Sequence, residues 1–155
     1  MYLETTVVSY LVAWPSRDAI TAARQRLTRE WWHVSRENFE LFVSEAVVRE
    51  AEAGDPEMAE RRIAALKGIP ALESTDEVLR LGQAILRTGA IPLKAADDAI
   101  HIAMAAVHRV DFLLTWNVRH IANANTRRTV ANVCLIHGYD LPAICNPGDL
   151  IGGDR

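Results

Sequence analysis

Two groups of polar residues that could take part in catalysis flank one apolar stretch of the chain, Lys94 to Ile121. The first group, Asp97, Asp98 and His101, lies at the start of a segment with helical periodicity. The second group follows a short apolar run and consists of Asn117, Arg119 and His120. Acids at a helix start and a polar turn after a buried strand are typical of α/β active sites, although a helix cap and an ordinary loop explain the same residues.

Four oxygen-bearing side chains stand at the ends of predicted elements of an α/β fold. Glu4 ends a first strand, Glu50 lies in the helix after a second strand, Asp98 starts a helix, and Asn117 follows the strand after it. Ligand sites of such folds form at the carboxyl ends of the strands, so these residues could converge. Carboxylates brought together repel one another, and a hard divalent cation such as Mg²⁺ or Mn²⁺ relieves that repulsion. A site of this kind suits phosphodiester hydrolysis.

The stretch from Lys94 to Ile121 predicts a helix followed by a buried strand. Ile100, Ala103, Met104 and Val107 recur at the i, i+3, i+4, i+7 spacing of a buried helix face. The apolar run from Phe112 to Thr115 is typical of a strand buried on both faces.

The rest of the chain alternates strands with helices. It predicts strands over 2–5, 41–43, 69–72 and 143–145, and helices over 7–12, 16–36, 44–53, 55–67, 75–88 and 120–137. The predicted helix-capping residues are Ser16, Ser44, Asp55 with Pro56, and Ser74 or Thr75. Short connections between alternating elements favour an α/β fold, a three-layer α/β/α sandwich with a mostly parallel central sheet. We interpret residues 1–155 as one domain.

Composition limits the classes of function. The chain has 155 residues, 50% of them hydrophobic, and its 17 basic and 20 acidic residues give a net charge of -3. This balance argues against a protein that coats DNA through a broad positive field, so any contact with nucleic acid must be local. Cys134 and Cys145 lack metal-binding spacing and are typical of a reducing cytoplasm. With no signal-peptide pattern and no apolar run of about 20 residues, we expect a soluble cytoplasmic protein without membrane contact.

Four strings of residues carry a resemblance to a known family. In chain order they are YLETTVVSYL, FVSEAVVREAEAGDP, DAIHIA and LLTWNVRHI. Each is weak alone, but in this order and spacing the chain resembles, over nearly its whole length, the PIN-domain ribonucleases, specifically the VapC-like toxins of type II toxin–antitoxin systems. The resemblance implies a PIN-like fold.

The resemblance also selects the candidate site among the 20 acidic residues. It implies that Glu4, Glu50, Asp98 and Asn117 are the catalytic residues and hold Mg²⁺ or Mn²⁺, directly or through water. Glu4 stands where Asp is more usual, and Asn117 where many members have Asp. Because Asn117 lacks a charge and Glu4 has a longer side chain, we expect weaker metal affinity than in a four-acid site.

Some neighbouring residues have two interpretations. Asp97 and Asp98 point about 100° apart on a helix, so the DAIHIA match selects Asp98 and leaves Asp97 as an acid favoured by the helix dipole. His101 is either a hydrogen-bonded packing residue or a catalytic or ligand residue. Glu45 competes with Glu50, but its place near a helix N-terminus explains it without chemistry.

Hydroxyl and basic residues near these positions are also ambiguous. A hydroxyl beside Glu4 or Asn117 could hold a metal-bound water or a neighbouring carboxylate, or cap a helix; the candidates are Thr5, Thr6, Ser9 and Thr115. Local positive charge for RNA phosphates could come from Arg119, His120, Arg127 and Arg128. Packing, rather than base stacking, is the favoured role of Trp31 and Trp32.

The predicted function is therefore a metal-dependent endoribonuclease, the toxin of a toxin–antitoxin pair. The resemblance further implies an RNA substrate, inhibition by a small antitoxin protein, and a homodimer. The alternative is a PIN-like fold with a degraded metal site that acts as an RNA-binding or protein-interaction module; Glu4 and Asn117 motivate it.

Overall fold

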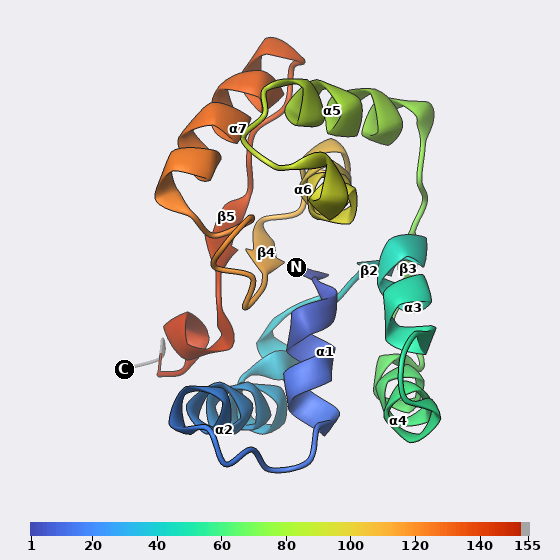
Figure 1. Cartoon of the computed structure of the whole chain (residues 1–155), viewed down its shortest axis with the longest axis vertical. Helices are drawn as coiled ribbons and strands as arrows, with labels where there is room; N and C mark the ends of the chain where they lie inside the picture. Colours follow the sequence, from blue (N-terminus) through green and yellow to red (C-terminus); the bar gives the residue numbers. More distant parts are fainter. Residues whose placement is uncertain (153–155) are drawn as a thin grey trace.

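Parallel strands cross the middle of the molecule in the computed structural model, which describes residues 1–152 (Figure 1). One sheet has the order β1–β4–β5 and a second pairs β2 with β3, all in parallel. The bounds are β1 Tyr2–Leu3, β2 Val43–Ser44, β3 Ala71–Leu72, β4 Phe112–Leu114 and β5 Ala143–Cys145. A parallel bridge between Tyr2 and Phe42 joins the two sheets, so the order across the molecule is β3, β2, β1, β4, β5.

The order of the strands reverses between β1 and β4. From β1 the chain continues to β2 on one side, and β4 later pairs with the other side of β1. Ligand sites of open α/β sheets form at such a switch point, beyond the carboxyl ends of the strands. Glu4 directly follows β1 and Thr115 directly follows β4, so this is where a site is expected.

Helices cover both faces of the strands, which confirms the predicted α/β/α sandwich. Figure 1 shows α5, α6 and α7 on one side, α1 and α2 on the other, and α3 with α4 near β3. The bounds are α1 Thr5–Val12, α2 Ala19–Val34, α3 Glu45–Glu52, α4 Pro56–Leu66, α5 Asp76–Arg87, α6 Ala96–Val107 and α7 Ala124–Ile136. Short 3₁₀ turns are η1 Arg36–Asn38, η2 Leu93–Ala95 and η3 Pro147–Leu150.

Helix α6 is buried around most of its circumference. It packs against α5, α3 and β4, and its buried residues are Ala99, His101, Ile102, Ala103, Met104, Ala105 and Ala106. The one-faced pattern predicted from the sequence was too narrow, because residues outside that face, such as Ile102 and Ala105, are also buried. Within the predicted face, Ile100 and Val107 are only half-buried. Small alanines let neighbouring elements approach α6 from several sides. The polar side chain of His101 is therefore held inside the core.

Local signals placed most helix boundaries correctly. Ser44, Asp55 and Thr75 each accept a backbone hydrogen bond at the start of a helix, as predicted. Ser16 was wrong as the cap of α2: Asp18 accepts from the backbone N–H of Thr21, and the helix starts at Ala19. Asp is at least as good an N-cap as Ser, and the local sequence offered both.

The helix predicted over 120–137 begins later than expected. Asn123 caps α7, whose first residue is Ala124. Before it the chain makes a turn in which the backbone N–H groups of Ile121 and Ala122 donate to the carbonyl oxygen of Asn117. The polar residues after β4 thus lie in a turn rather than on a helix.

Trp31 is fully buried and packs 6.2 Å from both Trp32 and Phe39, measured between ring centroids. This confirms the packing role of the tryptophan pair. Ile20, in the first turn of α2, is by contrast 67% exposed. No helix within residues 1–152 is long and apolar enough to cross a membrane.

Candidate metal site at the carboxyl ends of β1 and β4

Glu4 is fixed by hydrogen bonds to one of its two carboxylate oxygens. It lies between β1 and α1 and is 3% exposed. Its Oε2 accepts from the Thr6 backbone N–H at 3.1 Å, from the Thr6 hydroxyl, and from the Thr115 hydroxyl at 2.7 Å. The Thr6 hydroxyl also accepts from the Trp116 backbone N–H at 2.9 Å. The threonines therefore hold the carboxylate, one of the three roles that the sequence left open for Thr6 and Thr115.

The other oxygen of Glu4, Oε1, accepts no hydrogen bond from residues 1–152. Burial raises the pKa of this carboxyl, while the charge of His101 and the hydrogen bonds from Thr6 and Thr115 oppose the shift. A buried carboxylate with a free oxygen is costly unless a positive charge lies beside it. A cation beside Oε1 would therefore stabilise the ionised form of Glu4.

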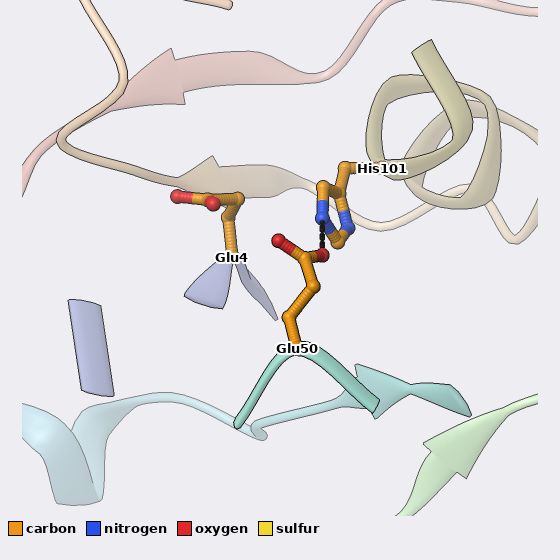
Figure 2. A group of neighbouring side chains, drawn as sticks. All are labelled: Glu4, Glu50 and His101. Atoms are coloured by element: carbon orange, nitrogen blue, oxygen red, sulfur yellow. Dashed lines mark hydrogen bonds and ion pairs between the residues drawn. The ribbon is translucent and has the colours of Figure 1, made fainter. Parts of the chain in front are cut away.

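Glu50 approaches Glu4 from the last turn of α3. Its Oε1 lies 2.5 Å from Nε2 of His101, and its side chain is 31% exposed. Within residues 1–152 no hydrogen bond involves its Oε2. Figure 2 shows the Glu50 carboxylate reaching from α3 toward the His101 ring, with its second oxygen on the side of Glu4. Glu50 therefore also has one oxygen held and one without a donor.

Glu4, Glu50 and His101 form the group that could hold a metal ion. One carboxylate oxygen from each Glu and one ring nitrogen of His101 all lie within 4.8 Å of one another. Such spacing is close enough for the atoms to surround one ion or its bound waters. The ring is fully buried. Burial lowers the pKa of His101, but the hydrogen bond with Glu50 and the charges of Glu4, Glu50 and Asp98 outweigh it, and the pKa is raised overall.

Asp98 lies one turn before His101 on α6, outside this group of three. Its Oδ2 lies 2.8 Å from Nδ1 of His120, and the two side chains are 16% and 20% exposed. No hydrogen bond to Oδ1 occurs within the described residues. Asp98 thus repeats the pattern of the two glutamates, with one oxygen held by a neighbour and the other free.

Asn117 uses its oxygen locally. Its Oδ1 accepts from the His120 backbone N–H at 3.1 Å, and its own N–H donates to the Thr115 hydroxyl at 2.9 Å. The side chain thereby caps the turn that places His120 beside Asp98. In this conformation the side-chain oxygen of Asn117 orders the turn.

The competing acids lie away from the group. Asp97 is exposed and pairs with Arg49 at 3.2 Å, and Glu45 is exposed in the first turn of α3. Among the basic residues expected near the site, His120 is half-buried, and the exposed ones are Arg119, Arg127 and Arg128.

The sequence did not predict the contact between His101 and Glu50, and Tyr2 was not among the candidate site residues. The Tyr2 hydroxyl lies 2.7 Å from Nδ1 of His101 and 2.7 Å from the Ser44 hydroxyl. Burial raises the pKa of Tyr2, so the phenol keeps its proton. The available signal was a tyrosine inside the first strand, two residues before Glu4.

Comparisons with protein-family models, with curated proteins and with solved structures returned no match.

Proposed function

We propose that the chain is a metal-dependent endoribonuclease that hydrolyses RNA phosphodiester bonds. The observation that carries the proposal is the pairing of Glu4 and Glu50 beside the switch point of the sheet. Each carboxylate has one oxygen held by the protein and the other without a donor. Two such oxygens, supplied by different elements, favour a shared cation over an isolated ion pair or helix cap.

The residues present fit Mg²⁺ or Mn²⁺, which prefer oxygen ligands. Glu4 and Glu50 would hold the ion, and Asp98 would contribute its free oxygen, directly or through water, because Mg²⁺ keeps several waters when bound. When bound, the cation would orient the scissile phosphate, activate a water for attack and neutralise developing negative charge. The hydroxyls of Thr6 and Thr115 orient Glu4.

Substrate access comes from the side of Glu50 and Asp98, because Glu4 is almost fully buried while the Glu50 side chain is 31% exposed. Arg49 and Arg119 are exposed on α3 and on the turn after β4. Their charge would favour a polyanion locally, despite the net charge of -3. RNA rather than DNA is proposed on the resemblance to PIN-domain ribonucleases.

The same resemblance supports the proposed biological role. The chain would be the VapC-like toxin of a toxin–antitoxin pair, act in the cytoplasm as a homodimer, and be inhibited by a small antitoxin protein.

The test is cleavage of labelled RNA by the purified protein with Mg²⁺ or Mn²⁺, with and without EDTA. We expect metal-dependent cleavage that Glu50→Gln abolishes and that Glu45→Gln, a matched change of an exposed acid on the same helix, leaves intact. Cleavage that is unaffected by EDTA, or that survives unchanged in Glu50→Gln, would refute the proposal. Parallel reactions with DNA and small phosphate esters test the substrate class.

A second candidate is a PIN-like RNA-binding or protein-interaction module without activity. Two observations favour it, because they show predicted metal ligands in contact with the protein itself. The side-chain oxygen of Asn117 accepts from the His120 backbone N–H, and Asp98 pairs with the His120 ring. Tight RNA binding without cleavage, unaffected by EDTA, would establish this module instead.

A further inference from the structure

A line of buried side chains runs from the second strand to Glu50. The Ser44 hydroxyl lies 2.7 Å from the Tyr2 hydroxyl, which lies 2.7 Å from Nδ1 of His101, and Nε2 of His101 lies 2.5 Å from Oε1 of Glu50. Ser44, Tyr2 and His101 are each 0% exposed. The four residues come from β2, β1, α6 and α3, so the line connects elements distant in sequence.

The direction of these hydrogen bonds follows from the groups at the Ser44 end. The Val47 backbone N–H donates to the Ser44 hydroxyl oxygen at 3.3 Å. The Ser44 hydroxyl hydrogen then has the Tyr2 oxygen as its acceptor. Tyr2, having accepted from Ser44, donates its own hydrogen to Nδ1 of His101. The opposite direction would leave the Ser44 hydroxyl hydrogen without an acceptor in a fully buried position.

The same assignment fixes the hydrogen of the imidazole ring. Since Nδ1 accepts from Tyr2, the neutral ring carries its hydrogen on Nε2, where it donates to Oε1 of Glu50, and the protonated ring that the raised pKa of His101 favours carries this Nε2–H as well. Both nitrogens of His101 are therefore used within the protein, and the ring has no lone pair left for an ion. Oε2 of Glu50 remains free.

We propose that Ser44, Tyr2 and His101 form a positioning relay for Glu50, in which the Tyr2 hydroxyl sets the tautomer of His101 and the His101 Nε2–H holds Glu50 ready for the metal. His101 is then a positioning residue and not a metal ligand. This inference rests on the proposed function, because it assigns Glu50 to the cation. Partners that orient a ligating carboxylate typically change metal affinity or activity by about 10–100-fold when removed.

The principal variant is Tyr2→Phe, which removes only the hydroxyl. The matched control is Tyr10→Phe: Tyr10 is half-buried on α1, and its hydroxyl accepts a weak 3.4 Å hydrogen bond from Arg24. Isothermal titration with Mn²⁺ should show affinity about tenfold lower or worse for Tyr2→Phe, and unchanged for Tyr10→Phe. Equal affinity in the two variants would overturn the relay.

Two measurements separate positioning from general loss of structure. Nitrogen-detected NMR of the metal-free wild-type protein should show the His101 hydrogen on Nε2; a ring without hydrogen on Nε2 would overturn the assignment and does not depend on metal binding. His101→Gln, which keeps an N–H donor at similar reach, should retain more Mn²⁺ affinity than His101→Leu. The reverse order, or equal affinity in the two variants, would refute the relay.

Failure of the relay is distinct from failure of the proposed function. If the wild-type protein binds no Mn²⁺, both the metal site and the proposed role of the relay in positioning Glu50 for the metal are refuted. If the wild-type protein binds Mn²⁺ and Tyr2→Phe binds it equally well, the relay alone is refuted and the metal site stands.

Discussion

The hydroxyl of Thr115 donates a 2.7 Å hydrogen bond to Oε2 of Glu4, joining residues 111 positions apart in the sequence. Thr115 follows β4 and Glu4 follows β1, and these strands pair in parallel with Leu3 opposite Leu114. The bond therefore connects the two sides of the switch point. It also fixes which oxygen of Glu4 remains free.

Thr115→Val should destabilise the protein, because valine has nearly the same shape but cannot donate to Glu4 or accept from the Asn117 backbone N–H. We expect a loss of about 1–3 kcal/mol in the free energy of unfolding, the usual effect of leaving buried polar groups unpaired. Urea unfolding monitored by circular dichroism measures it. Thr129→Val on α7, where the hydroxyl makes only a 3.4 Å bond to Asn125 O, should cost less than about 0.5 kcal/mol; an equal loss in both variants would contradict the role of Thr115.

Metal affinity should fall in a fixed order among acid variants. Glu50→Gln should lower the affinity for Mn²⁺ most, since Glu50 belongs to the group of three. Asp98→Asn should lower it less, because Asp98 lies outside that group and pairs with His120. Asp97→Asn, a neighbouring acid paired with exposed Arg49, should have no effect. Calorimetric titration gives the order. If Asp97→Asn lowers the affinity for Mn²⁺ as much as Asp98→Asn does, the affinity depends on the total negative charge at the start of α6 and not on the position of Asp98.

Stability without metal should depend on pH through Glu4, whose pKa is raised by burial. A carboxyl with a raised folded-state pKa contributes stability that is fully present below its unfolded pKa and is lost as the pH rises through the folded pKa. In EDTA, Glu4→Gln should therefore be more stable than the wild type at pH 7, by on the order of 1 kcal/mol, and the difference should shrink near pH 4. Thermal unfolding at both pH values tests this.

Adding Mn²⁺ at pH 7 should make the wild type more stable than Glu4→Gln. An ion that binds the folded state at 100 times its dissociation constant stabilises it by about 2.7 kcal/mol, and Glu4→Gln lacks the charge to benefit. A variant that gains as much thermal stability from Mn²⁺ as the wild type would show that Glu4 does not hold the metal.

The cysteine thiols should be poorly reactive in the folded protein. Burial raises the pKa of both Cys134 and Cys145 to about 11, so only about one thiol in a thousand is thiolate at pH 8. Labelling by a disulfide reagent at pH 8 should be about 100-fold slower or more than in guanidinium-unfolded protein. The rate should rise with pH up to about 11 for the same reason. Rapid labelling of the folded protein at pH 8 would contradict the shielded state of the thiols.

The sequence by itself determined the elements and most of their boundaries. Ser44, Asp55 and Thr75 cap helices because a side-chain oxygen near the chain's own N–H groups acts locally, and apolar runs bounded by turn residues identified every strand to within a few residues. The α/β class followed from the alternation of these elements. Glu4, Glu50 and Asp98 were identified only through the resemblance, since periodicity does not distinguish one acid from another.

Only the tertiary structure decided which of these residues lie together and which oxygen of each is free. Pairing of β1 with β4 brings Thr115 to Glu4, and burial of α6 around most of its circumference brings His101 between Tyr2 and Glu50. These contacts join elements far apart in the chain, so no local pattern encodes them. The physical reason is that a hydrogen bond depends on distances of about 3 Å and on direction, which the packing of helices on a sheet sets and the spacing of residues in a sequence does not.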